Sequence, residues 1–204
     1  MSGRVAVLVS GSGTNLQALI DARHRQELSG ELALVLSNRP GARALERAKA
    51  AGIEALALDH QAFADRESFD RALDLELRQR RIDLVVLAGF MRLLTPWFVG
   101  EWYGRLVNIH PSLLPEFPGA HALRDCLAAR ALRTGVTIHF VDPGCDTGPV
   151  IAQAVLDVSP LDTEETLALR VHHLEHQLYP RVVELIVRGE VRLEDGRVVK
   201  PPER

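Results

Sequence analysis

The feature that most constrains the fold is a repeated alternation of short β-branched or apolar runs with segments of helical periodicity. The first two runs are residues 5–9 and 32–36, and a later run, residues 84–88, is apolar throughout. Apolar residues between positions 16 and 20 follow the first run at the spacing of one helix face. Successive strand–helix units of this length predict an α/β fold, with a mostly parallel central sheet covered by helices on both faces.

The same patterns predict the remaining elements. We expect further strands at 53–58, 107–109, 136–141 and 150–158, and helices at 42–51, 67–80, 123–132 and 163–188. Asp162 and Glu165 are the expected capping pair of the last helix, and Pro180 is expected to kink or break it. The Asp195-Gly196 pair predicts a hairpin within 191–199, as a C-terminal antiparallel extension. The sequence contains no repeat or linker, so we expect a single domain over 1–204 with a frayed end at 201–204.

Composition narrows the class of protein. The chain has 204 residues with 24 basic and 27 acidic side chains, a net charge of −3, which argues against a coat for nucleic acid or an anionic membrane. Its two cysteines, Cys126 and Cys145, are too few for a disulfide framework and suit a reducing cytoplasm. The longest apolar stretch, residues 84–91, is far short of a membrane span. We therefore expect a cytoplasmic protein that binds neither nucleic acid nor membrane.

The first predicted strand ends in a glycine-containing loop. Its residues are Gly11, Ser12, Gly13, Thr14 and Asn15. Glycines permit a tight turn, and free N–H groups at the start of the following helix favour a phosphate. The loop lacks the Gly-Lys-Ser/Thr ending of a P-loop and the third glycine of a dinucleotide fingerprint. By itself it fits phosphate binding and a tight turn capped by asparagine or threonine equally well.

Asn108 and His110 form a more specific signal. Residues two apart in a strand project to the same side, so an amide and an imidazole are presented together at the strand end. An irregular segment with three prolines, residues 111–119, follows directly. Since α/β sheets place active sites at the carboxyl ends of strands, we interpret this pair as catalytic rather than as a buried structural histidine with a polar neighbour.

The turn at 142–149 contains a second candidate, Asp146. Aspartates often only make turn hydrogen bonds. A carboxylate beside a histidine, however, raises the pKa of the imidazole and orients it, which would create an acid/base pair. Cys145 has no basic group paired to it, so we interpret it as a bystander. His172 and His176 lie one helical turn apart, but without a His-Glu-x-x-His motif or a cysteine cluster we expect no metal.

Six short motifs together resemble a known family. They occupy residues 11–15, 87–94, 108–115, 118–119, 135–139 and 146–151. In this order and spacing the chain, from residue 5 to about 184, resembles the phosphoribosylglycinamide formyltransferases, folate-dependent enzymes of de novo purine synthesis. The resemblance implies a Rossmann-like formyltransferase fold and transfer of a formyl group from 10-formyltetrahydrofolate, as cosubstrate, to the amine of glycinamide ribonucleotide. It also implies a metal-free enzyme that acts as a monomer or homodimer.

The resemblance also assigns roles to residues. It implies a catalytic trio of Asn108, His110 and Asp146. The ribonucleotide would be bound by Gly11, Ser12, Gly13, Thr14, Asn15, Pro111 and Glu175, and the folate by Arg66, Met91, Arg92, Leu93, Leu94, Asn108, Val141 and Asp142. The chain departs from the family pattern at His172, where relatives often have Lys or Gln, at Glu116, where Lys is frequent, and at 128–134, which lacks an acidic Gly-Asp stretch.

Three other functions would each require a different sequence. A methionyl-tRNA formyltransferase would need a C-terminal tRNA domain and basic charge. A formyltetrahydrofolate deformylase would carry an N-terminal regulatory domain and a second histidine where this chain has Pro111. A non-catalytic nucleotide-binding module would use only the first loop and would have no reason to hold Asn, His and Asp at this spacing.

The expected mechanism is direct attack by the substrate amine on the formyl carbon. Asn108 and His110 would donate hydrogen bonds to the formyl oxygen as charge develops on it. Asp146 would keep His110 protonated and oriented, and a nearby water could relay the proton between the two nitrogens. His139, on the next predicted strand, would either support this arrangement or simply pack in the sheet.

Overall fold

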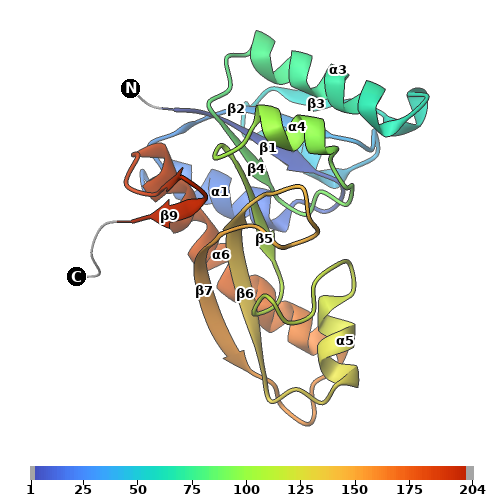
Figure 1. The fold of residues 1–204 in the computed structure, drawn as a ribbon, viewed down its shortest axis with the longest axis vertical. Helices are drawn as coiled ribbons and strands as arrows, with labels where there is room; N and C mark the ends of the chain where they lie inside the picture. The colour runs from blue at the N-terminus through green and yellow to red at the C-terminus, as the bar shows by residue number, and fades with distance from the viewer. Residues whose placement is uncertain (1–2, 201–204) are drawn as a thin grey trace.

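The structure, a computed structural model, describes residues 3–200 and contains a seven-stranded central sheet in the order β3-β2-β1-β4-β5-β6-β7 (Figure 1). Strands β1 to β5 pair in parallel, whereas β6 and β7 are antiparallel to their neighbours. The predicted α/β fold with a mostly parallel central sheet is therefore confirmed. The strands are β1 (Arg4–Val9), β2 (Glu31–Ser37), β3 (Ala55–Ala57), β4 (Leu84–Leu87), β5 (Leu106–His110), β6 (Arg133–Phe140) and β7 (Val150–Asp157).

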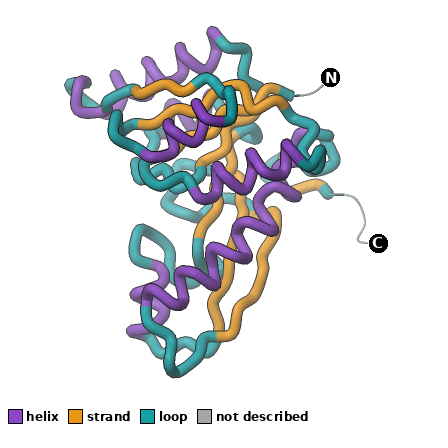
Figure 2. Tube along the Cα trace, turned by 180° about the vertical axis from the view of Figure 1, so that it is seen from behind, coloured by secondary structure: helices purple, strands orange, loops and turns teal. Residues whose placement is uncertain are grey.

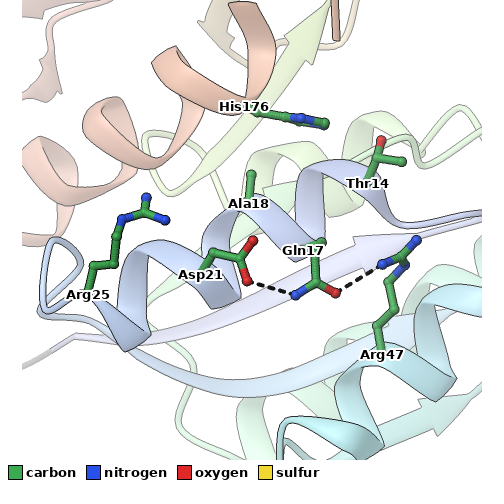
Figure 3. Close-up of a pocket in the computed structure, with 7 residues that line it drawn as sticks. All are labelled: Thr14, Gln17, Ala18, Asp21, Arg25, Arg47 and His176. Atoms are coloured by element: carbon green, nitrogen blue, oxygen red, sulfur yellow. Dashed lines mark hydrogen bonds between the residues drawn. The ribbon is translucent and has the colours of Figure 1, made fainter. Parts of the chain in front are cut away.

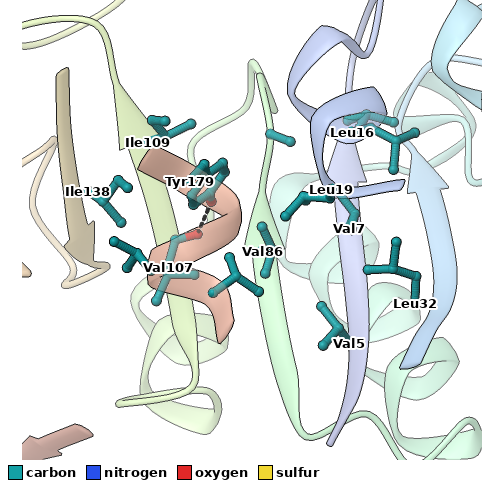
Figure 4. Packing of buried hydrophobic residues seen from close by; sticks show 14 of the residues in the cluster. Val5, Val7, Leu16, Leu19, Leu32, Val86, Val107, Ile109, Ile138 and Tyr179 are labelled. Atoms are coloured by element: carbon teal, nitrogen blue, oxygen red, sulfur yellow. Dashed lines mark hydrogen bonds between the residues drawn. The ribbon is translucent and has the colours of Figure 1, made fainter. Parts of the chain in front are cut away.

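Helices cover both faces of the sheet, as Figures 1 and 2 show from opposite sides. Alternate residues of β1 point to opposite faces, so Val5 and Val7 join the core under α1 and α6, whereas Ala6 and Leu8 join the core under α3 and α4. Figure 4 shows the first of these cores. The helices are α1 (Thr14–His24), α2 (Arg43–Ala50), α3 (Arg66–Gln79), α4 (Pro96–Glu101), α5 (Ala122–Ala128) and α6 (Glu164–Val187), with a short 3₁₀ helix at His60–Ala62.

Several predicted boundaries were wrong. The helix expected at 123–132 ends at Ala128, and β6 already begins at Arg133. Helix α6 is capped by Thr163 and Thr166 rather than by Asp162 and Glu165. It also continues through Pro180 instead of breaking there, because Tyr179, Val182 and Val183 around the proline are buried in the core and hold the helix in place.

The C-terminal hairpin was predicted correctly. Strands β8 (Arg192–Glu194) and β9 (Arg197–Val199) pair in antiparallel orientation around Asp195 and Gly196. Both turn residues have positive φ, 49° and 75°, as a two-residue turn of this type requires. The expected fraying at 201–204 lies outside the described residues. Within residues 3–200, none of the helices is both long and apolar enough to cross a bilayer.

The sheet topology brings several loops to one edge. The chain adds β2 and β3 on one side of β1 and then β4 and β5 on the other, so the order in which strands are added reverses between β1 and β4. Ligands of open α/β sheets bind outside the carboxyl ends of the strands at such a switch point. Ser10 connects the loops here, since its N–H donates to Gly89 O at 3.1 Å and its Oγ accepts from Met91 N at 2.8 Å.

Candidate active site

The structure brings Asn108, His110 and Asp146 together at the carboxyl end of β5. His110 is 4% exposed, and its Nδ1 lies 3.4 Å from Asp146 Oδ2. Its Nε2 lies 2.9 Å from the carbonyl oxygen of Phe117. Because a carbonyl only accepts, Nε2 must carry a proton. His110 Nδ1 faces the Asp146 carboxylate, so the imidazole lies between two acceptors.

Asp146 is ionised by its surroundings. Its Oδ2 accepts from the backbone N–H of Gly119 at 2.8 Å, and its Oδ1 accepts from Asn108 Nδ2 at 3.4 Å. The pKa of Asp146 is held far below its ordinary value of 3.8, chiefly by the His139 imidazole and further by the Gly119 N–H and the charge of His110, against the opposing effect of burial. The site therefore contains a permanent negative charge behind His110.

The two residues that contact the His110 ring, Phe117 and Asp146, have uncommon backbone conformations. Phe117 has φ 51° and Asp146 has φ 55°, in the left-handed region that side chains other than glycine rarely adopt. Such conformations are of order 1–3 kcal/mol less favourable and persist where surrounding structure fixes them, commonly at functional sites. The irregular segment at 111–119 and the turn at 142–149 thus serve to place an acceptor on each side of one imidazole.

His139 is a further member of this cluster. Its Nδ1 lies 2.9 Å from Phe140 O, so this nitrogen carries a proton. Nε2 faces Asn108 Nδ2 at 3.3 Å and Asp146 Oδ1 at 3.7 Å. The sequence left His139 open between support and simple packing, and the structure places it in direct contact with the side chains of the candidate trio.

The glycine loop leads into helix α1 without a side-chain cap. Gly13, at the N-cap position, has φ 73°, and among residues 3–200 no side chain accepts from the first turn. The alternative of a cap by Thr14 or Asn15 is therefore wrong. Asn15 lies inside the helix and donates instead to Glu175 Oε2, at 2.9 Å. The first backbone N–H groups of α1 thus remain available to an anion.

Gly13 is expected to be intolerant of any side chain. A Cβ there would lie 2.6 Å from Ala44 Cβ, whereas one on Gly11 would meet nothing within 4 Å. We expect Gly13→Ala to lower the free energy of unfolding by about 1–3 kcal/mol, because the left-handed backbone and the clash add. Gly11→Ala is the matched control and should be near neutral. Urea denaturation of both variants tests this, and equal stability of the two would contradict it.

Glu175 joins α6 to the start of α1. It is 3% exposed, and its Oε2 accepts from Asn15 as well as from His172 Nδ1 at 2.8 Å. The hydrogen bond with Glu175 raises the pKa of His172, while partial burial opposes the shift. The rings of His172 and His176 stack 6.2 Å apart, and burial lowers the pKa of His176. The loop and the late helix therefore form one polar surface.

A groove of about 230 Å³ extends from this surface along α1 (Figure 3). Arg47 is a lining residue that the sequence analysis did not single out. Its Nε donates to Ser12 O at 2.8 Å and its Nη1 to Gln17 Oε1 at 3.0 Å, which brings positive charge beside the glycine loop. No motif marks Arg47, because its contact with the loop depends on how α2 packs against α1. The lining residues are Thr14, Gln17, Ala18, Asp21, Arg25, Arg47 and His176.

The residues expected to bind folate lie on two loops and at the start of α3. Met91 and Leu93 are 66% and 61% exposed, unusually high for large apolar side chains next to a site. The Arg92 guanidinium lies 4.7 Å from the centre of the Phe69 ring. Asp142 accepts from Thr147 Oγ1 at 2.8 Å, which closes the turn after β6. Of the others, Arg66 is the first residue of α3, and Leu94 and Val141 pack against the core under α3. Pro111, which is expected on the ribonucleotide side, follows His110 directly.

The two cysteines are the remaining candidates for reactive side chains. Cys145 Sγ lies 3.6 Å from Asp146 Oδ2. Burial and the adjacent Asp146 charge raise the pKa of this thiol, the opposite of what a nucleophilic cysteine requires. Neither Cys145 nor Cys126 is in a disulfide. Within residues 3–200, His, Cys, Asp and Glu side chains do not gather in a group that could hold a metal ion.

Comparison with known proteins gives three consistent findings. A family model described as formyl transferase matches residues 3–183. The chain is 44% identical over 192 residues to the phosphoribosylglycinamide formyltransferase of Escherichia coli (strain K12), covering 94% of this chain and 91% of that protein. The crystal structure of glycinamide ribonucleotide transformylase 1 from Symbiobacterium toebii matches with a TM-score of 0.94 and 43% identity, over 98% of this chain and 94% of that chain.

Some relatives are much longer proteins. The trifunctional purine biosynthetic protein adenosine-3 of Drosophila melanogaster is 50% identical to this chain over 188 residues, which are 91% of this chain. The chain spans only 14% of the length of that protein.

Proposed function

The chain belongs to the formyl transferase family, and on that basis we propose that it is a phosphoribosylglycinamide formyltransferase. It transfers the formyl group of 10-formyltetrahydrofolate to the amine of glycinamide ribonucleotide in de novo purine synthesis, as one domain that requires no metal. The observation that carries this proposal is the cluster of Asn108, His110 and Asp146 at the switch-point edge of the sheet, between the glycine loop and the segment that begins at Met91.

Catalysis begins with attack of the neutral amine on the formyl carbon. The oxygen of the resulting tetrahedral intermediate is negative, and the charge of His110 together with the Asn108 amide stabilises it. Asp146 is the counter-charge that retains the proton on His110. The C–N10 bond then breaks, and the proton lost by the attacking nitrogen is delivered to N10 through a water held near Asp146. No covalent intermediate with the protein is needed, because positioning of the two substrates makes the amine sufficiently reactive.

Asp146 sets the orientation of the Asn108 amide. An Asn side chain can be held with its nitrogen or its oxygen toward a given neighbour. Here Nδ2 donates to the Asp146 carboxylate at 3.4 Å and lies 3.3 Å from His139 Nε2. One N–H is therefore held by Asp146 and the other is available to the formyl oxygen, whereas the flipped amide would place two oxygens together.

The two substrates approach from opposite loops. The ribonucleotide phosphate binds at the uncapped start of α1, where backbone N–H groups and the helix dipole favour an anion. Glu175, on the same surface, accepts from the substrate with the carboxylate oxygen not used by Asn15 and His172. The folate lies along the exposed Met91 and Leu93 and the loop after β6. Calorimetry with each ligand separately tests this arrangement, and a protein that binds neither would contradict it.

Replacing Glu175 should affect the ribonucleotide selectively. Glu175→Gln retains an acceptor for Asn15 but removes the charge that faces His172. We expect ribonucleotide affinity to fall by about tenfold or more, since hydrogen bonds to charged groups contribute ~1.5–3 kcal/mol, with donor affinity nearly unchanged. The pKa of His172 should fall back toward its ordinary value of 6.5, which NMR titration measures.

The matched control for Glu175 is His173→Gln. His173 lies on the same helix, is exposed and contacts Gln177 at 2.8 Å, so both affinities should remain as in the wild type. If Glu175→Gln binds the ribonucleotide as tightly as His173→Gln does, the assigned substrate contact is wrong.

We place the enzyme in the cytoplasm, because a reducing compartment suits its two unpaired cysteines. It acts there as a monomer or homodimer, with the ribonucleotide and the formylfolate as its only required partners.

A further inference from the structure

A buried carboxylate on α3, that of Asp70, takes no part in the proposed reaction, and one of its oxygens has no hydrogen-bond partner within residues 3–200. Asp70 is 0% exposed, and its Oδ2 accepts from the backbone N–H of Thr95 at 2.6 Å. Its Oδ1 is buried and has no hydrogen-bond partner within residues 3–200. A buried charge with one oxygen unpaired is costly, so a well-packed apolar residue would stabilise the fold better. An aspartate at residue 70 is therefore better explained by its contact with the Thr95 N–H than by a contribution to the stability of the fold.

Asp70 holds one end of the segment between β4 and α4. Ser10 fixes the start of this segment through Met91 N, and Asp70 fixes its end through Thr95 N. Thr95 is also the N-cap of α4, where its Oγ1 accepts from Phe98 N at 3.3 Å. Residues 92–94 thus run between two fixed points. Each point is a hydrogen bond from a backbone N–H to a side chain, not a bond between strands of the sheet.

Asp70 also determines which side of the segment faces outward. Arg92 is drawn inward over Phe69, and its Nε is buried without a hydrogen-bond partner among residues 3–200, like Asp70 Oδ1. Arg92 Nε is a donor in a cationic group, and Asp70 Oδ1 is an acceptor in an anionic group. Burial raises the pKa of Asp70 above its ordinary value, against the lowering effects of the Thr95 hydrogen bonds and of the Arg92 and Arg66 charges. With Arg92 inward, its neighbours Met91 and Leu93 are left exposed.

We propose that Asp70 is a positioning residue for the formyl donor: it fixes the 91–95 segment through the Thr95 amide and attracts Arg92, so that Met91 and Leu93 present their side chains to the folate. This inference rests on the proposed function, which assigns the segment to formylfolate. Asp70 touches no substrate and acts through the segment alone.

The test compares two aspartates on the same helix. Asp74 lies one turn after Asp70, is also buried, and accepts from Trp102 Nε1 at 2.9 Å and from Arg78 Nε. Asp74→Asn is therefore a matched control with a purely structural role. Asp70→Asn retains an acceptor for Thr95 but removes the charge, and Asp70→Ala removes both. The probes are 10-formyltetrahydrofolate without ribonucleotide, and glycinamide ribonucleotide alone, each followed by calorimetry.

We expect Asp70→Asn to weaken donor binding about tenfold and Asp70→Ala about a hundredfold, on the scale of hydrogen bonds to charged groups. Ribonucleotide affinity should stay within twofold, and kcat at saturating donor should change much less than KM for the donor. Asp74→Asn should lower Tm without changing donor affinity. A folded Asp70→Asn protein with unchanged donor affinity, or with equal losses for both ligands, would overturn the inference. A wild-type protein that binds no formylfolate would instead overturn the proposed function.

Discussion

Replacing Asp146 by asparagine is expected to lower kcat by roughly 10²–10⁴-fold, the scale of a lost acid/base contribution. The substitution is isosteric and retains an acceptor for Gly119 N–H, so the turn itself should close as before. What it removes is the negative charge 3.4 Å from His110 Nδ1. Without that charge His110 loses the carboxylate partner that orients it, and turnover should fall. Ligand affinities should change much less.

The same variant has a stability signature. The pKa of Asp146 is depressed in the folded protein, so its ionisation contributes stability above the ordinary value of 3.8, and this contribution is lost as the pH falls below it. The stability difference between wild type and Asp146→Asn should therefore be largest at neutral pH and shrink below about pH 4. Cys145→Ser is the control for the turn and should retain kcat, because its thiol is held protonated. Wild-type turnover in Asp146→Asn, with an unchanged histidine titration by NMR, would show that the pairing has no catalytic role.

Removing either donor to the formyl oxygen should have a comparable effect. We expect His110→Ala and Asn108→Ala each to lower kcat by roughly 10²-fold or more, the scale for losing one oxyanion donor. His110→Ala also removes the charge that the Asp146 carboxylate is placed to hold. Asn108→Ala leaves His110 and Asp146 in place, so the two variants separate the amide contribution from the imidazolium contribution.

Steady-state kinetics with both substrates at saturation measure these effects, and thermal unfolding checks that each variant is folded. His139→Asn provides an informative comparison, since His139 contacts Asn108 and Asp146 without facing the substrate, and its loss should cost less than that of Asn108. Near-wild-type turnover in folded His110→Ala or Asn108→Ala would remove that residue from the mechanism.

Much of the fold could be predicted from local patterns. The apolar runs that become β1, β2 and β4 are buried in the sheet, and their short length favours strands over helices. Asn108 and His110 share a side of β5 because strand geometry requires it. Asp195 and Gly196 form the hairpin because few residue pairs accept positive φ at both positions.

Other features depend on contacts between distant residues. Helix α4 was missed because it has only 6 residues, too few to show a helical periodicity. It is held in place by the packing of Phe98 and Val99 into the core. The sequence left a cap of α1 by Asn15 open, because the hydrogen bond that Asn15 forms is with Glu175, 160 residues away. Asp70 and Arg47 lie in none of the recognised motifs, and their contacts appear only when α3 and α2 are placed beside the loops they touch.

The most direct test of the proposed function is turnover by the purified protein. Mixed with 10-formyltetrahydrofolate and glycinamide ribonucleotide, the protein should release tetrahydrofolate and form formylglycinamide ribonucleotide in equal amounts, and omission of the ribonucleotide should stop the release. Tetrahydrofolate released at the same rate without ribonucleotide, with formate as the other product, would contradict this account and identify the protein as a deformylase.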